Sequence, residues 1–271
     1  MSLGQEVEER LSVALPLVEE AGRLALAHFR QPIVVENKLG PGAFDPVTAA
    51  DRGVEALIRA GLGRVWPDSP IQGEEEGFTP GESEWSWIID PIDGTRAFIS
   101  GVPAWGILLG LLKAGRPVAG IMRQPYLDET FLGGPSGAWL LRAGSRLPLR
   151  ASGKASLGEA ILYSTQPRLF ADPAEQAGFD RVAAAVRMAR FGGDCYSYCL
   201  LAHGCIDLVI ESGLQPYDIV PLIPILEAAG GVVTGLDGAP PLNGGTVIAA
   251  ASPALHAQAL ALMRAAGQEA R

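Results

Sequence analysis

The run WIIDPIDGT at residues 87–95 constrains this chain most, because it places two carboxylates at the end of a strongly apolar segment. Short apolar runs bounded by turn-forming residues are typical of buried strands. Carboxylates at the end of such a strand repel one another and lose solvation, which costs free energy unless a cation offsets both effects. Asp90 and Asp93 are therefore either a turn acid and a helix N-cap or part of a cation site.

Further acids occur at equivalent places along the chain. Glu74 lies in GEEEG at residues 73–77, directly after the short strand-like run SPIQ. Two neighbouring strand ends would bring Glu74 close to Asp90 and Asp93. Asp218 opens a later helix, where an N-cap is again the alternative role. Because no His or Cys accompanies these acids, the set suits a hard cation, and Mg²⁺ is the ion expected beside a phosphate.

Gly94 and Thr95 follow these acids at the start of a predicted helix. Backbone N–H groups at a helix start can donate to a phosphate oxygen. A cation site next to such donors indicates phosphoryl chemistry. Signatures of other chemistries are missing from the sequence, which has neither a G-x-S-x-G nucleophile motif nor a P-loop.

Composition limits the class of protein. The chain has 271 residues, 48% of them hydrophobic, which is enough for one large domain or two tightly packed halves. The net charge of −9 argues against a nucleic-acid partner. No uncharged apolar stretch reaches the length of a membrane span, and the acidic N-terminus is unlike a signal peptide. We therefore expect a cytoplasmic protein without a membrane partner.

The cysteines favour reduced thiols. Cys195, Cys199 and Cys205 are odd in number and clustered, which does not suit a disulfide framework. Cys195, Cys199 and His203 also fall at helical spacing, so a soft-metal site is an alternative. Buried free thiols on an apolar helix are the preferred interpretation.

Alternating helical and strand-like patterns predict an α/β fold in two halves. Residues 1–150 indicate an α+β half, with a long amphipathic helix bent or restarted at Pro16 and a second helix capped by Thr48 and Asp51. Residues 151–271 indicate an α/β half. Strands are expected at 85–90, 105–112, 117–123, 129–132, 138–141, 160–164, 206–211, 232–236 and 246–250, and helices at 5–30, 48–62, 173–188, 196–203, 217–229 and 253–266. No linker separates the halves, so we expect one continuous structural unit.

Four segments resemble the inositol monophosphatase-like, Mg²⁺-dependent, lithium-sensitive phosphatase superfamily. They are DPVTAAD at 45–51, GEE at 73–75, WIIDPIDGT at 87–95 and YDIVPLIPILEAAGGVVT at 217–234. The resemblance implies a layered αβαβα sandwich. It also implies a phosphomonoesterase in which a metal-activated water attacks a small phosphorylated metabolite in line.

The resemblance assigns roles residue by residue. It implies metal ligation by Glu74, Asp90, the Ile92 carbonyl, Asp93 and Asp218, with two or three Mg²⁺ ions per site. It further implies that Thr95 and Asp45 orient and help to deprotonate the attacking water, that Glu74 is also catalytic, and that Asp93, Gly94 and Thr95 contact the phosphate. A homodimer is expected as well.

Two stretches resemble the histidinol-phosphate phosphatase branch, namely DGTRAFISGVPAWG at 93–106 and GGDCYSYCLLAHGCIDLVIESGLQPYD at 192–218. Tyr217 stands where inositol phosphatases of the superfamily typically carry Trp. The resemblance implies that Asp194 and Glu211 contact the substrate, while a helix N-cap and a solvated strand-end charge are their alternative roles. Histidinol phosphate, an intermediate of histidine biosynthesis, is thus the predicted substrate. An inositol or other polyol phosphate is the second hypothesis, and a non-catalytic binding protein is the third.

Overall fold

A computed structural model of the chain describes residues 1–38 and 46–269. Within these residues the larger sheet has eight strands in the order β10-β9-β8-β7-β6-β5-β3-β4, and every neighbouring pair except β3–β5 is antiparallel. The strands are β3 Ile71–Gly73, β4 Phe78–Thr79, β5 Trp85–Asp93, β6 Gly106–Lys113, β7 Arg116–Gln124, β8 Glu129–Gly134, β9 Gly137–Arg142 and β10 Ser145–Pro148. The predicted, largely antiparallel sheet is therefore confirmed.

The smaller sheet has five strands within the same described residues, in the order β12-β11-β13-β15-β14. Strand β11 is parallel to β12 and β13, and β15 is antiparallel to β13 and β14. The strands are β11 Ile161–Ser164, β12 Met188–Phe191, β13 Leu208–Leu214, β14 Val232–Gly235 and β15 Gly245–Ala250. A separate antiparallel pair joins β1 Glu36–Asn37 to β2 Pro46–Val47.

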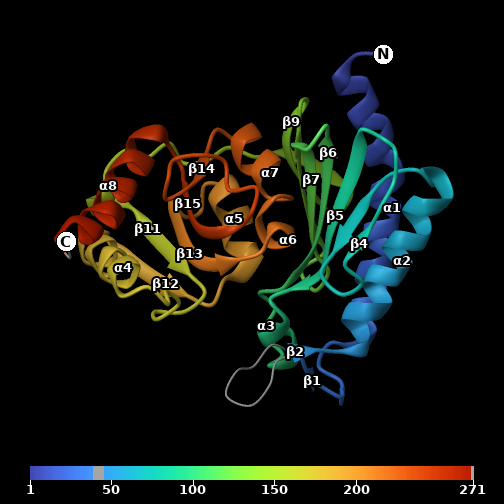
Figure 1. Cartoon of the computed structure of the whole chain (residues 1–271), viewed down its shortest axis with the longest axis horizontal. Helices are drawn as coiled ribbons and strands as arrows, with labels where there is room; N and C mark the ends of the chain where they lie inside the picture. The colour runs from blue at the N-terminus through green and yellow to red at the C-terminus, as the bar shows by residue number, and fades with distance from the viewer. Residues whose placement is uncertain (39–45, 270–271) are drawn as a thin grey trace.

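The helices complete a five-layer arrangement. They are α1 Leu3–His28, α2 Ala49–Val65, α3 Thr95–Ile99, α4 Pro173–Ala185, α5 Asp194–Ala202, α6 Pro216–Ile219, α7 Ile223–Ala228 and α8 Pro253–Glu269, with a 3₁₀ turn η1 at Leu157–Glu159. Helices α1 and α2 cover the outer face of the larger sheet, α5, α6 and α7 lie between the sheets, and α4 and α8 cover the outer face of the smaller sheet (Figure 1). The αβαβα order is the one expected.

Helix α2 illustrates how the sequence builds these layers. Thr48 is its N-cap and Asp51 its third residue, and their side chains form the predicted capping box. Val54, Ile58 and Leu62 follow at helical spacing and are fully buried in the apolar cluster that α1 and α2 form with the larger sheet. The apolar side of α2 therefore faces the larger sheet.

Several boundaries differ from the prediction. The helix expected at 217–229 is two helices, α6 and α7, because Pro221 and Pro224 each lack an N–H and their rings hinder a continuous helix. Helix α1 continues through Pro16 without the restart that was an alternative. The edge strands β10 and β12 were not predicted, since their residues are mostly exposed and lack an apolar pattern.

The two halves meet where α7 packs on the larger sheet. The larger sheet uses residues before 150 and the smaller sheet residues after it, while the division into two halves of one structural unit stays a prediction. None of the described helices combines the length and the apolarity needed to cross a lipid bilayer.

Two glycines allow this contact, and one of them provides a test of it. A Cβ atom at Gly133 would lie 2.2 Å from the Ile225 Cα, and one at Gly120 would lie 1.7 Å from the Pro221 carbonyl oxygen. We expect Gly133→Ala to lower the free energy of unfolding by about 1–3 kcal/mol, because α7 must move off the sheet. Urea denaturation measures the change.

The matched control is Gly63→Ala in α2, where nothing lies within 4 Å of the added Cβ. It should leave stability unchanged or raise it by up to about 1 kcal/mol. A Gly133→Ala protein as stable as wild type would contradict the close approach.

Candidate active site

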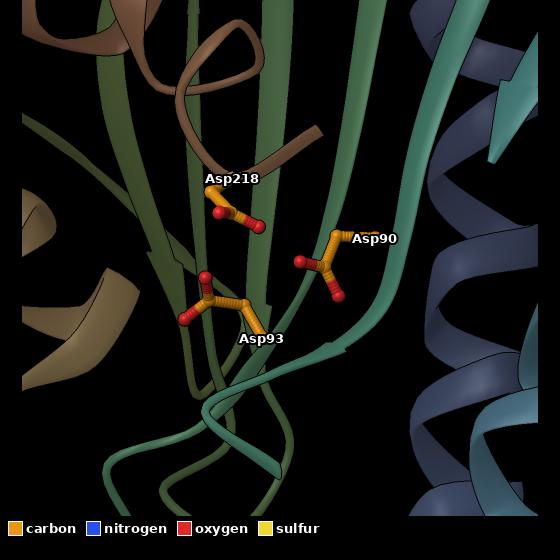
Figure 2. Close-up of side chains that lie close together, drawn as sticks. All are labelled: Asp90, Asp93 and Asp218. Carbon is orange, nitrogen blue, oxygen red and sulfur yellow. The ribbon is translucent and has the colours of Figure 1, made fainter. Parts of the chain in front are cut away.

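A bulge in β5 brings Asp90 and Asp93 to one side of the strand. Asp90 lies opposite Leu108 and Asp93 opposite Gly106, so β5 has one residue more than β6 over this span. Side chains three residues apart in a regular strand point to opposite faces. The extra residue reverses this, and both side chains lie on the side of the strand where Asp218 is found (Figure 2).

The three aspartates form a compact acidic cluster. Carboxylate oxygens of Asp90, Asp93 and Asp218 lie within 4.8 Å of one another. Asp90 is 1% exposed. Asp93 accepts a hydrogen bond from the backbone N–H of Cys195 at 2.8 Å, which ties it to the first turn of α5. Asp218 is the third residue of α6 and accepts from the backbone N–H of Gln215 at 2.7 Å, so the N-cap is Gln215 and not Asp218.

Glu74 joins this cluster because β3 runs parallel to β5. Gly73 pairs with Ile89, so the carboxyl ends of both strands meet at the same edge of the sheet. Glu74 follows directly and lines the same cavity as Asp90, Asp93 and Asp218. Its Oε1 atom accepts from the Lys38 ammonium at 2.9 Å, and Lys38 also pairs with Glu75. The prediction that two strand ends bring these acids together is confirmed.

Burial and mutual repulsion set the electrostatics of the cluster. Burial, followed by neighbouring acids, raises the pKa of Glu74 from 4.5 to about 7, although Lys38 acts in the opposite direction. Burial and the adjacent carboxylates also raise the pKa of Asp90 and Asp93 well above 3.8. The ionised cluster therefore carries more negative charge than Lys38 offsets. Carboxylate oxygens at this spacing could hold a divalent cation that supplies the missing positive charge.

Thr95 connects the cluster to Asp51, a residue that sequence reasoning assigned only to helix capping. The Thr95 hydroxyl donates to the Ile92 carbonyl at 3.0 Å and lies 3.5 Å from Asp51 Oδ1. The other oxygen of Asp51 accepts from the backbone and the hydroxyl of Thr48. Asp51 is fully buried, which raises its pKa. Its place in DPVTAAD is the available signal. The predicted partner of Thr95 is the first acid of that motif, Asp45, which lies outside the described residues, so that assignment stays a prediction.

Asp194 and Glu211 line the cavity of about 380 Å³ that also contains the acidic cluster. Glu211 is 2% exposed, so the alternative of a solvated strand-end charge is wrong. Its Oε1 atom accepts from the backbone N–H of Thr165 at 2.8 Å and from the Thr165 hydroxyl. Gly193, and not Asp194, is the N-cap of α5. Burial and the nearby Glu211 raise the pKa of Asp194 to about 7.

Other predicted residues fall in or near this cavity. Ile92, Gly94 and Thr95 line it, and Tyr198, which the sequence analysis did not single out, adds a buried hydroxyl beside Glu211. Cys195 and Cys199 are buried free thiols, as preferred in the sequence interpretation, while Cys205 is exposed.

The pKa values predict how stability depends on pH when no cation is bound. Between pH 4.5 and about 7 the folded protein retains a proton on Glu74 that the unfolded chain has released. Stability therefore falls as pH rises through this window, and the raised pKa values of Asp90 and Asp93 act in the same direction. We expect the melting temperature in EDTA to decrease from pH 5 to 7.5.

Asp90→Asn serves as the control, because it removes one repelling charge and should flatten this slope. Excess Mg²⁺ should remove most of the slope in the wild-type protein. A wild-type melting temperature that is independent of pH in EDTA, or a slope unchanged in Asp90→Asn, would contradict the electrostatic account.

Comparison with known proteins agrees with this geometry. A profile described as the inositol monophosphatase family matches residues 6–268. The chain is 38% identical to the bifunctional phosphatase IMPL2, chloroplastic, of Arabidopsis thaliana, over 86% of the chain and 66% of that protein. It is 34% identical to a histidinol-phosphatase of Mycobacterium tuberculosis, over 94% and 98% of the two chains. A solved inositol monophosphatase from Zymomonas mobilis superimposes with a TM-score of 0.83 at 36% identity, over 95% and 98% of the chains. The chain is therefore a phosphatase that belongs to the inositol monophosphatase family.

Proposed function

We propose that this phosphatase hydrolyses histidinol phosphate to histidinol and phosphate in a reaction that requires a divalent cation. One observation carries the choice of substrate: the carboxylates of Asp194 and Glu211 line the same cavity as the acidic cluster. Histidinol phosphate has an ammonium group and an imidazole, whereas an inositol phosphate offers only hydroxyl groups beside its phosphate. Carboxylates in a partly dehydrated cavity favour the cationic compound.

The acidic cluster is assigned to cation binding. Its donors are all oxygen atoms, a set that suits Mg²⁺. Asp90, Asp93 and Asp218 would hold the ion together with Glu74 and the Ile92 carbonyl, and two or three ions per site remain part of the proposal. A cation bound there would offset the charge of the phosphate and polarise the phosphoryl group. The raised pKa values of Glu74, Asp90 and Asp93, caused by burial and then by the neighbouring acids, support this assignment, because a bound cation would stabilise the ionised carboxylates.

Thr95 and Asp51 are assigned to the attacking water. The Thr95 hydroxyl lies between the Ile92 carbonyl and Asp51 Oδ1. Because Thr48 already holds the Oδ2 atom of Asp51, Oδ1 is the oxygen available to the Thr95 hydroxyl. The raised pKa of Asp51 makes its carboxylate a stronger base. In this proposal the Thr95 hydroxyl orients the water, turns from the Ile92 carbonyl to Asp51 Oδ1, and passes its own proton to Asp51 as it takes one from the water. A role for Asp45, and phosphate contacts from Asp93, Gly94 and Thr95, stay predictions.

The remaining part of the cavity is assigned to the alcohol portion of the substrate. Glu211 is held rigidly by Thr165, and an ammonium group beside Glu211 and Asp194 would meet two acceptors. A homodimer stays a prediction, which sedimentation analysis would test.

Inositol 1-phosphate is the second candidate. The likeness to the Zymomonas mobilis inositol monophosphatase covers 95% of this chain, which supports it. A panel of phosphomonoesters assayed with Mg²⁺ separates the two hypotheses. We expect the highest kcat/KM for histidinol phosphate, and a higher value for inositol 1-phosphate would overturn the proposed substrate.

Removing a carboxylate from the substrate portion of the cavity tests the specificity directly. Asp194→Asn and Glu211→Gln each remove one negative charge and keep the size of the side chain. We expect kcat/KM for histidinol phosphate to fall by about 10- to 150-fold, the equivalent of the roughly 1.5–3 kcal/mol of a hydrogen bond to a charged group. The same variants should hydrolyse glycerol 2-phosphate nearly as well as wild type. Equal losses on both substrates would indicate a general defect and argue against the cation contact.

Removing the Thr95 hydroxyl tests its proposed role in orienting the attacking water. Thr95→Ala should lower kcat by about 10²–10⁴-fold, the usual contribution of general acid–base catalysis, with a smaller effect on KM. Thr95→Ser is the control, since it retains the hydroxyl and should retain most of the activity. Calorimetry should show unchanged Mg²⁺ affinity in Thr95→Ala. A large loss of affinity there would instead make Thr95 part of the cation site.

A further inference from the structure

A buried carboxylate of α2 holds the loop that carries Glu74. Glu55 is fully buried. Its Oε2 atom accepts a hydrogen bond from the backbone N–H of Glu75 at 2.8 Å, and its Oε1 atom accepts one from the backbone N–H of Glu76 at 3.0 Å. One side chain therefore fixes the two peptide groups that directly follow Glu74.

Arg59, one helical turn further along α2, holds the other end of the same loop. Its Nε atom donates to Glu55 Oε1 at 2.8 Å. Its two terminal nitrogens donate to the Gly77 carbonyl and to the Thr79 hydroxyl. We call these two residues the Glu55–Arg59 clamp. Glu55 accepts from the N–H groups of the loop and Arg59 donates to a carbonyl, so the clamp binds backbone groups of both kinds.

The loop lies against the clamp because residue 73 is glycine. A Cβ atom at Gly73 would lie 2.0 Å from Glu55 Oε1 and 2.7 Å from an Arg59 terminal nitrogen. The N–H of Gly73 donates to the Gly77 carbonyl at 2.9 Å, and the N–H of Glu74 donates to the Ile89 carbonyl at 3.3 Å. The backbone of Glu74 is thus attached to β5 on one side and to the clamp on the other.

We propose that Glu55 is a positioning residue of the cation site, which sets the direction of the Glu74 side chain and thereby the affinity for the divalent cation. This inference rests on the cation-dependent activity proposed above. Glu74 sits next to three other acids that repel it, and a loop free to move would let its carboxylate turn away. Holding the loop in advance removes that freedom, and residues that orient a metal ligand commonly change metal affinity by about 10- to 100-fold.

The charge of the clamp fits this role. Glu55 and Arg59 neutralise each other, with side chains that are 0% and 9% exposed, so the clamp adds no net charge beside an already acidic cluster. A lone buried carboxylate could also bind the N–H groups, but it would increase the repulsion on Glu74. Arg59 removes this cost and supplies the hydrogen bonds to the far end of the loop.

Glu55→Gln tests the proposal with a change of almost no volume. The amide keeps one acceptor oxygen but loses the second acceptor and the ion pair with Arg59. Titration calorimetry with Mg²⁺ or Mn²⁺ as the probe should show affinity reduced by about tenfold or more. Activity should recover toward the wild-type kcat at saturating Mg²⁺, with little change in KM for the phosphomonoester, because Glu55 does not line the cavity.

Asp207→Asn is the matched control for a loss of stability alone. Asp207 is also a fully buried carboxylate, and it holds Lys154, the Ser152 hydroxyl and the backbone N–H of Ile161 in the C-terminal half. We expect it to lower the melting temperature without changing cation affinity. If Glu55→Gln fails to fold, Arg59→Lys replaces it, because the lysine keeps the charge but loses the contacts with Gly77 and Thr79. The Mg²⁺ affinity of Arg59→Lys should then be lower than that of the wild-type protein.

The outcomes separate the two proposals. A wild-type protein that binds no divalent cation would overturn both the proposed function and this inference. Wild-type binding with unchanged affinity in Glu55→Gln, or in Arg59→Lys where that variant is used, would overturn the positioning role alone. An equal loss of affinity in Asp207→Asn would also overturn it, since general destabilisation would then explain the effect.

Discussion

Carboxylate repulsion is the interaction on which the rest of this structure depends. Three aspartates and Glu74 meet at one edge of the larger sheet. Burial there raises the pKa of Glu74, Asp90 and Asp93. Such a cluster destabilises the folded state when no cation is bound, and contacts with neighbouring elements offset part of this cost. Lys38 pairs with Glu74, the first turn of α5 donates to Asp93, and the Glu55–Arg59 clamp holds the loop between β3 and β4. A cation bound there would offset the repulsion and so recover the stability that the cluster costs.

The same cavity contains two acidic regions with different chemistry. The cluster at the end of β5 combines closely spaced oxygens that fit a small ion. Glu211 and Asp194 are attached to β13 and α5, from the second half of the chain, and one oxygen of Glu211 is already engaged by Thr165. In the proposed function, phosphate chemistry depends on residues from both halves, whereas selection of the alcohol depends on residues of the second half. Under this proposal, the substrate could change without a change in the residues that carry out the reaction.

Local patterns predicted much of the fold. The capping box of Thr48 and Asp51 and the apolar strand β5 follow from spacing and residue type, and the structure agrees. The two neighbouring strand ends also predicted that Glu74 lies near Asp90 and Asp93, as it does. The prediction was wrong where two local signals disagreed. The helical pattern at 217–229 outweighed Pro221 and Pro224 in the sequence interpretation, yet the prolines divide the segment. The capping role of Asp51 is confirmed, while the approach of its second oxygen to Thr95 is a contact that helix capping does not predict.

The sequence by itself determined the residue types of the site, the order of the segments that supply them, and the layered α/β class, because these depend on periodicity, turn residues and chemistry that are local in the chain. Only the tertiary structure decided which acids face one another. A regular β5 would have sent Asp90 and Asp93 to opposite faces, and one extra residue against β6 places them together. The burial of Glu211 and the clamp between Glu55 and the 74–77 loop were likewise decided by contacts between residues 20 to 46 positions apart. Such contacts exist only after the sheets and helices have packed, so no local pattern can encode them.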